Sequence, residues 1–213
     1  VLFRSVFSNI FKFRVENFPL YLLSGQIIFN FFSDATTSAM SAVINNAALI
    51  KKVYMPKYLF VISRVFSSFI NLLASFTALL VVMIATRAEL HWKVVFAVIP
   101  LGFIVVFSLG VGLLLSALVV KFRDIMHLYS VFITALLYLT PVIYPMSSLP
   151  YWMQKVVGLN PITNILMMFR DVMLYDNFPN LSSILIATIE SLTALGIGVY
   201  VFYKKQDEFI LNI

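Results

Sequence analysis

The sequence contains no cysteine and few charged residues. Without cysteine, the chain cannot form a disulfide, a thiolate metal site or a cysteine nucleophile. Asp, Glu, Lys and Arg together make up 11% of the 213 residues, where ordinary soluble domains have about 25%. The chain is 62% hydrophobic and has a mean hydropathy of +0.99. A chain this apolar cannot cover a water-exposed surface, so lipid must surround most of it.

Sequence motifs of nucleotide and catalytic sites are missing as well. There is no Walker A sequence G-x-x-x-x-G-K-S/T, no H-E-x-x-H and no G-x-S-x-G. Gly110 and Gly112 form a G-x-G, but this pair lies inside an apolar stretch and follows no strand. The net charge of +6 is scattered over connecting segments, which suits anionic lipid headgroups better than nucleic acid. We therefore expect a membrane protein that binds no nucleic acid and carries no cofactor or metal ion itself.

Five apolar stretches are long enough to form complete transmembrane helices, so the sequence predicts an all-α integral membrane protein. Such a helix needs about 20 predominantly apolar residues. The apolar stretch at residues 1–11 is too short, and we interpret it as the remnant of a truncated first helix or as an artefact of the first few residues. Residues 1–213 are expected to form a single transmembrane domain. The five predicted helices cover residues 19–44, 59–85, 94–120, 126–144 and 181–203.

The most polar connection, residues 45–64, joins the first two of these helices. The pattern predicts a short amphipathic helix at residues 47–54, which Met55-Pro56 ends because the residue before a proline disfavours the α region. Such a helix can lie on the bilayer or dock onto another protein, and its composition does not choose between the two. Four basic residues place this connection on the cytoplasmic side: Lys51, Lys52, Lys57 and Arg64.

Polar residues interrupt the predicted helices at several points. Asp34 lies near the middle of the first helix, and its carboxylate would cost about 2.5–3.5 kcal/mol in lipid, so we expect it to face the bundle interior. It is either a structural hydrogen-bonding residue or part of a transport path, and Glu190 in the last helix is either a structural partner or an acid–base group. A polar stripe with a spacing of four predicts a helix contact or a pore lining in the second helix. This stripe consists of Ser63, Ser67, Asn71 and Ser75.

Two short helices are predicted between the last two transmembrane helices, at residues 148–157 and 161–174. Asn160-Pro161 begins the second one, because Asn is a strong N-cap and proline suits the first helical position. Both place Trp, Met and Phe on one side and polar residues on the other, which indicates re-entrant or interfacial helices at the outer leaflet. His91 is expected to be an interfacial loop residue, since no His, Asp or Glu near it has metal-ligand spacing.

Five motifs in a fixed order make a family resemblance visible. They are PLYLLSGQIIFNFFSDA, NNAALIKKVYMPKY, KFRD, LTPVIYPMSSLP and LNPITNILMMFRDVML. In this order the chain, from about Phe11 onward, resembles the ABC-2 type permeases that export polysaccharides such as O-antigen, capsule and teichoic acid. Each motif alone is loose, whereas the five together at this spacing are specific. The resemblance implies the transmembrane domain of an ABC-2, type V-like exporter in the bacterial cytoplasmic membrane.

The resemblance also implies partners. Two permeases form a homodimer, and the complex contains two separate ATP-binding cassette ATPase subunits, which hold the ATP and magnesium. A lipid-linked glycan then passes between the permeases. Residues 45–56 correspond to the cytoplasmic coupling helix and the KFRD turn to an inner loop. The residues implied in coupling to the ATPase are Asn45, Asn46, Lys51, Lys52, Tyr54, Met55, Pro56, Phe122, Arg123 and Asp124.

Further site residues follow from the same resemblance. Residues 147–175 correspond to the outer gate helices, with Trp152, Asn160, Pro161, Phe169 and Arg170 as gate residues. Aromatic rings suit the C–H faces of sugars, although most membrane aromatics face lipid or headgroups. The candidates for the translocation path are Phe31, Phe32, Asp34, Tyr138 and Tyr144.

Two alternatives remain at this point. The first is an ABC-2 exporter of a drug, a lipid or a peptide, against which only the gate helices and the aromatic content speak. The second is a membrane-embedded enzyme that modifies glycans, with acid–base chemistry from Asp34, Glu190 and His91. These three residues are dispersed in the sequence, and no loop carries a cluster of catalytic polar groups.

Overall fold

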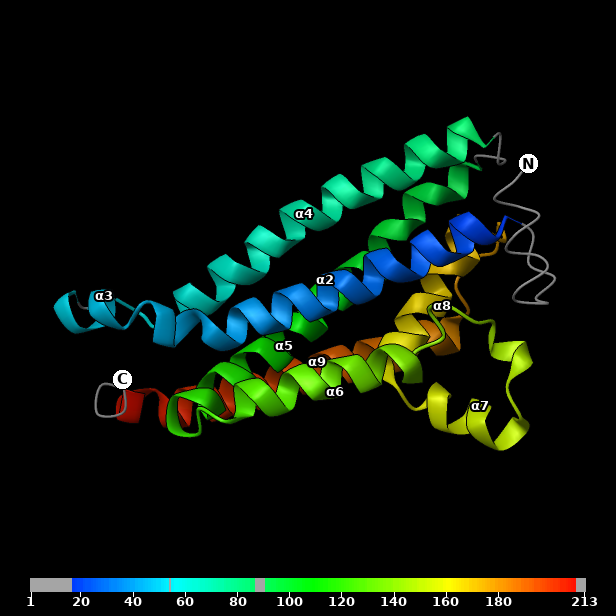
Figure 1. Cartoon of the computed structure of the whole chain (residues 1–213). Coiled ribbons are helices and arrows are strands. Elements are labelled where there is room, and N and C mark those ends of the chain that lie inside the picture. Colours follow the sequence, from blue (N-terminus) through cyan, green and yellow to red (C-terminus); the bar gives the residue numbers. More distant parts are fainter. Residues whose placement is uncertain (1–16, 54, 87–90, 210–213) are drawn as a thin grey trace.

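The computed structural model describes residues 17–53, 55–86 and 91–209, and all regular secondary structure in these ranges is helical. The long helices run side by side along one axis (Figure 1). The short helix α3 lies at one end of this bundle and α7 at the other. The predicted helix remnant at residues 1–11 and the coupling residue Tyr54 lie outside the described residues.

Four helical segments in these ranges are long and apolar enough to cross a membrane. They are α2 (Phe18–Asn45), α4 (Tyr58–Ala85), η1 (Trp92–Ala97) continued by α5 (Val98–Lys121), and α9 (Leu181–Lys205) continued by η3 (Gln206–Glu208). At a rise of 1.5 Å per residue, 28 residues extend about 42 Å, more than the bilayer core of about 30 Å. The chain is therefore embedded in a membrane, and four of the five predicted helices are confirmed.

The remaining predicted helix is shorter than the sequence pattern suggests. α6 (Ile125–Leu139) has 15 residues and reaches about 22 Å, whereas a complete span to residue 144 was predicted. The helix ends at Leu139 because Pro141 follows, and Thr140 is extended, with φ −105° and ψ 132°. The chain then continues without helix to η2 (Met146–Ser148). The prediction of a complete span at this position was therefore wrong in its length.

α2 and α5 form the buried centre of the bundle, while α4 and α9 expose most of their surface. α5 packs most extensively against α9, and α2 against α4 and α5. Glycines allow these close approaches. A Cβ atom on Gly198 of α9 would lie 2.1 Å from the carbonyl oxygen of Gly110 in α5, and one on Gly112 would lie 2.7 Å from Cβ of Ala39 in α2. The backbones of α5 and α9 therefore touch at Gly110 and Gly198, and α5 packs closely on the Ala39 methyl group of α2 at Gly112.

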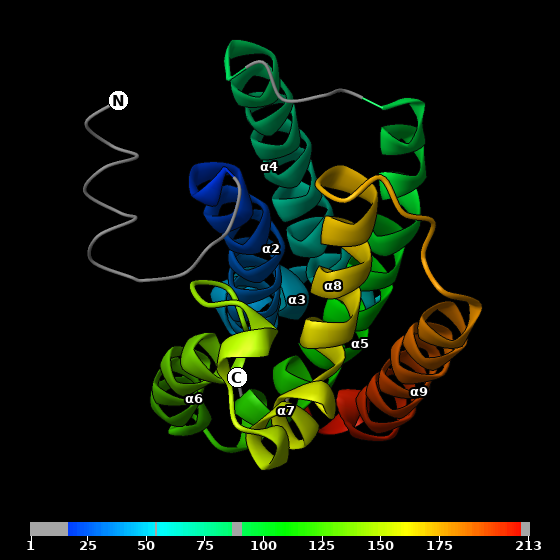
Figure 2. The ribbon, with the colours of Figure 1, turned by 90° about the vertical axis from the view of Figure 1, so that its right-hand side faces the viewer.

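The two short outer helices differ in their surroundings. α8 (Pro161–Met173) lies in the middle of the bundle end, between α2, α5 and α9 (Figure 2), and most of its side chains are buried. α7 (Tyr151–Gly158) lies at the rim and exposes its aromatic residues. The interfacial alternative therefore fits α7, whereas α8 enters the bundle.

Candidate functional site

The end of the molecule that the sequence predicts to be cytoplasmic, called the inner end below, carries the predicted coupling helix. After α2 ends at Asn45, Asn46 donates from Nδ2 to the carbonyl oxygen of Ala42 (2.7 Å), and α3 (Ala47–Lys52) begins at the next residue. Ile50 is buried and fixes α3 to the bundle, while Lys51 and Lys52 are exposed. Val53 is extended and ends the helix, and Met55 and Pro56 follow in an exposed turn. The helix begins where the sequence predicted it but ends at Lys52, because Val53 is extended, and not at the predicted Met55-Pro56.

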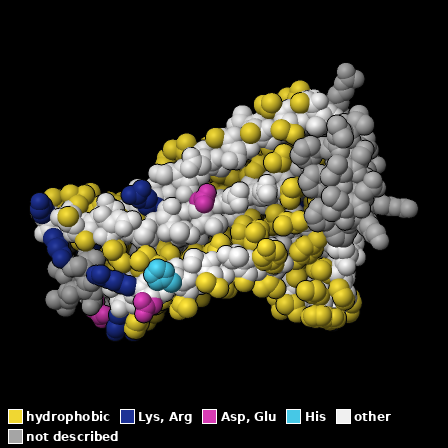
Figure 3. All heavy atoms as spheres, in the orientation of Figure 1, with side chains coloured by type: hydrophobic (Ala, Val, Ile, Leu, Met, Phe, Trp, Pro, Cys, Tyr) yellow, Lys and Arg dark blue, Asp and Glu magenta, His cyan; other side chains and the backbone are white. Residues whose placement is uncertain are grey.

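The KFRD turn lies at the same end of the bundle. Lys121 ends α5, and Phe122, Arg123 and Asp124 are exposed before α6 begins. Figure 3 shows that, among the described residues on this face, the Lys and Arg side chains gather toward the α3 end. The structure therefore brings the two inner loops to one basic, water-accessible end of the molecule.

Lys57 has a role that the sequence did not reveal. Its Nζ donates to the carbonyl oxygen of Gln206 and lies 5.7 Å from the centre of the Phe209 ring. Phe209 is 1% exposed and packs edge-on against Phe202 of α9, with ring centres 5.3 Å apart. The turn that follows α3 is thus tied to the end of α9, whereas sequence analysis treated Lys57 only as a marker of the cytoplasmic side.

A cavity of about 280 Å³ opens between α2 and α4, and polar side chains from both helices line part of its otherwise apolar wall. Gln26, Asn30 and Asp34 line it from α2, where a spacing of four places them on one helix face. Asn71 and Ser75 line it from α4. Asp34 is exposed to this cavity, so the expectation that it faces the bundle interior was wrong. We call these five residues the polar groove.

The polar groove contains only part of the predicted translocation path. Phe31 lines its wall, but Phe32 is buried and stacks on Phe107 of α5 at 5.6 Å. Tyr138 is 67% exposed on α6, and Tyr144 donates from Oη to the carbonyl oxygen of Tyr138 (2.7 Å). The aromatic candidates therefore lie in two places, Phe31 and Phe32 on α2 and Tyr138 and Tyr144 at and after the end of α6. Sequence analysis missed Gln26 and Asn30, although their spacing of four from Asp34 was a usable signal.

The outer residues surround the start and the middle of α8. Asn160 caps the helix, since its Oδ1 accepts from the backbone N–H of Ile162 (3.0 Å), and Pro161 occupies the first position. Phe169 is buried and meets Phe76 of α4 edge-on, with ring centres 6.2 Å apart. Trp152 is 66% exposed on α7. Arg170, predicted as a gate residue on the polar side of an interfacial helix, is 1% exposed.

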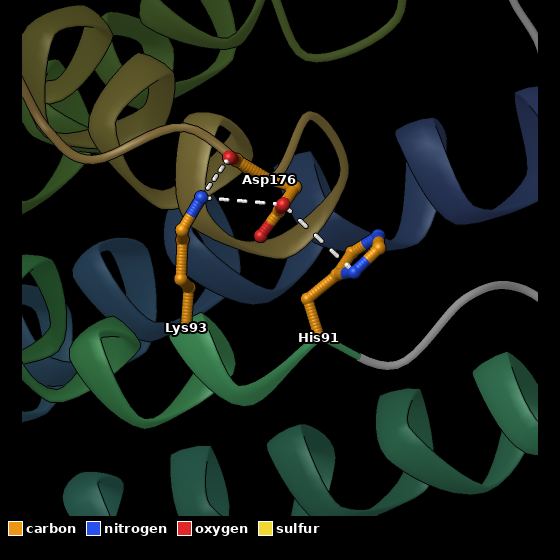
Figure 4. Close-up of polar contacts among 3 residues, drawn as sticks. All are labelled: His91, Lys93 and Asp176. Atoms are coloured by element: carbon orange, nitrogen blue, oxygen red, sulfur yellow. Dashed lines mark hydrogen bonds and ion pairs between the residues drawn. The ribbon is translucent and has the colours of Figure 1, made fainter.

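A second polar contact ties the outer loops together (Figure 4). Lys93 Nζ lies 3.2 Å from the carboxylate of Asp176 and donates to the carbonyl oxygen of the same residue (2.7 Å). His91 Nδ1 lies 3.9 Å from that carboxylate, so His91 faces an acidic group at the outer end. Among the described residues, no group of three His, Asp or Glu side chains is arranged to hold a metal ion.

Comparison with known proteins adds an independent observation. A family model described as "ABC-2 type transporter" matches residues 1–174. An "O-antigen export system permease protein RfbA" of Klebsiella pneumoniae is 24% identical over 211 residues, which cover 98% of this chain and 81% of the relative. A protein of the same name from Myxococcus xanthus is 24% identical over 210 residues, with the same coverage of both chains.

Proposed function

Because the chain belongs to the ABC-2 type transporter family, we propose that it is the permease subunit of an ATP-driven exporter that moves a lipid-linked polysaccharide across the bacterial cytoplasmic membrane. Two relatives that carry the name of O-antigen export permeases support this cargo. The polar groove is the observation on which the proposal mainly rests, because it places polar side chains, a carboxylate among them, on two neighbouring membrane-crossing helices.

The chemistry of the groove suits a sugar polymer. Amide, carboxylate and hydroxyl groups offer the donors and acceptors that sugar hydroxyls need. In lipid, the carboxylate of Asp34 alone would cost about 2.5–3.5 kcal/mol, so the groove needs water or protein against it. In the proposed homodimer, the grooves of two copies face each other and enclose a wet path for the glycan.

The energy source lies on other chains in this proposal. The sequence has no Walker A motif, so two separate ATPase subunits bind ATP and magnesium. α3 docks on them through its exposed side chains, with Leu49 as the apolar contact and Lys51 and Lys52 as charged contacts. The support is the position of α3 at the inner end of α2, directly connected to a helix of the groove.

Charge reversal tests the docking. We expect Lys51→Glu with Lys52→Glu to weaken binding of the ATPase about tenfold, since each 1.4 kcal/mol corresponds to a factor of ten. The measurement is copurification of the complex together with its ATP hydrolysis. Lys155→Glu is the matched control, because Lys155 is an exposed base on α7, at the opposite end of the molecule from α3. If the double variant assembles and hydrolyses ATP like the wild type, α3 is not the coupling helix.

Depletion of the permease tests the cargo. We expect glycan linked to its lipid carrier to accumulate on the cytoplasmic side and to disappear from the cell surface. A normal glycan surface after depletion would favour an exporter of a drug, a lipid or a peptide.

The enzyme alternative loses support from the positions of its groups. Asp34 lies in the groove, His91 lies at the outer end, and Glu190 accepts from Asn164 Nδ2 on α8 (3.5 Å).

A further inference from the structure

Arg170 is a fully buried cation on the outer helix α8, and its guanidinium makes five hydrogen bonds. Nη1 donates to the Tyr21 hydroxyl (2.7 Å) and to the carbonyl oxygen of Pro141 (2.6 Å). Nη2 donates to the carbonyl oxygens of Tyr21 (3.0 Å) and Val142 (2.9 Å), and Nε donates to Ser24 Oγ (3.3 Å). All five acceptors are neutral oxygens, so the charge is satisfied by dipoles held in fixed positions.

The five acceptors lie on two other parts of the chain that pack against α8. Tyr21 and Ser24 lie on the outer end of α2, and Pro141 and Val142 lie in the non-helical segment after α6. The Tyr21 ring also stacks under the guanidinium, 3.6 Å from its central carbon. A Cβ atom on Gly25 would lie 2.6 Å from Nη2, so the guanidinium lies directly against the α2 backbone. Arg170 thus fastens α8 to α2 at one well-defined point.

α2 connects the Arg170 contact near one of its ends to α3 at the other. α2 runs without interruption from Phe18 to Asn45, and α3 begins two residues later. One of the elements that hold α8 in the bundle is therefore the helix that carries α3. α7 has no comparable link, since Tyr151 and Trp152 are exposed and its main contact is with α8.

We propose that Arg170 is a positioning residue that makes α8 and α2 one rigid unit, so that movement of α3 at the inner end reaches the outer end of the export path. The proposal rests on the function proposed above for the ATPase contact of α3. In this arrangement, α2 transmits the movement, α8 moves with it, and α7 follows α8.

The test uses the intact permease–ATPase complex in lipid nanodiscs, with hydrogen exchange as a readout that does not depend on the cargo. In the wild type, we expect a non-hydrolysable ATP analogue to change amide exchange at residues 18–25 and 161–173 together. In Arg170→Met, the change should persist at residues 18–25 and fall at least threefold at residues 161–173. Arg170→Lys, which keeps a cation, should restore part of the response. An equal response at residues 161–173 in Arg170→Met and wild type would overturn the proposal.

A control separates positioning from simple loss of stability. Met173→Ala removes a buried side chain from the same helix without touching the Arg170 contacts, and it should leave the joint response intact. If Met173→Ala abolishes the response as strongly as Arg170→Met, the role of Arg170 is only structural. Should Arg170→Met fail to fold, Tyr21→Phe takes its place, because it keeps the stacked ring and removes only the hydroxyl, which accepts from Arg170 and donates to the carbonyl oxygen of Tyr144 (3.0 Å). It should reduce the response about twofold, and an unchanged response would contradict the proposal.

Export adds a second readout that depends on the cargo. Glycan exported per ATP hydrolysed should fall at least tenfold in Arg170→Met, while complex assembly and ATP hydrolysis persist. If the wild-type complex exports no glycan, the proposed cargo is wrong. In that case, the exchange experiment still decides the role of Arg170 by itself.

Discussion

Asn160 uses both ends of its amide group to join two distant segments. Its Oδ1 caps α8, and its Nδ2 donates to Thr140 Oγ1, directly after the end of α6 (2.9 Å). We expect Asn160→Ala to destabilise the protein by about 1 kcal/mol or more, because loss of an N-cap costs about that much. Asn160→Asp should cost less, since it keeps the cap and loses only the donor to Thr140. Thermal unfolding in detergent measures both, and equal losses would show that the cap contributes little.

Residues whose partners are close in sequence were predictable, and those with distant partners were not. The cap at Asn160 was predicted because it depends on a neighbour two residues away. The pattern of hydrophobic residues around Arg170 and Lys93 does not show which groups accept hydrogen bonds from them. These acceptors lie 28 to 149 residues away in the sequence. A residue type shows that a charge needs acceptors, but only the packing of helices decides whether these are water, a carboxylate or backbone carbonyls.

The contact between α5 and α9 depends on the absence of two side chains. We expect Gly198→Ala to destabilise the protein by about 1–3 kcal/mol, because the new methyl group overlaps the Gly110 carbonyl and must push the helices apart. Gly196→Ala is the matched control on the same helix, since its Cβ atom would have no neighbour within 4 Å. It should be neutral or slightly stabilising, because alanine favours helix. Unfolding temperatures in detergent compare the two, and similar values would contradict the close contact.

Hydropathy predicted the positions of the membrane-crossing helices better than it predicted where helices end or what surrounds them. Four membrane-crossing helices follow from long apolar stretches, because lipid imposes a minimum length. α6 is shorter because Pro141 outweighs the apolar residues around it. α8 has a polar and an apolar side, and this pattern does not reveal whether the polar side meets water or the carbonyls of another element. The polar side of α8 meets those carbonyls at Arg170.

The polar groove gives one side of the molecule a surface that we expect water to reach within the membrane. Labelling of introduced cysteines can test this expectation. Because these 213 residues contain no cysteine, a thiol introduced at one position is the single thiol among them. We expect Asn71→Cys to react at least tenfold faster with a water-soluble maleimide than Ile189→Cys, because thiolate formation requires water. Ile189 is the control, since it is 62% exposed on α9 but lies outside the groove. Faster labelling of Ile189→Cys would show that the groove faces lipid.

The surroundings of Arg170 also bear on how the chain enters the membrane during synthesis. Every group that accepts a hydrogen bond from Arg170 precedes it, by 28 to 149 residues. Since a ribosome makes the N-terminal part first, α2 and the segment after α6 are synthesised before α8. The groups that can accept from Arg170 in place of water are therefore made before the arginine, whose charge is costly in lipid.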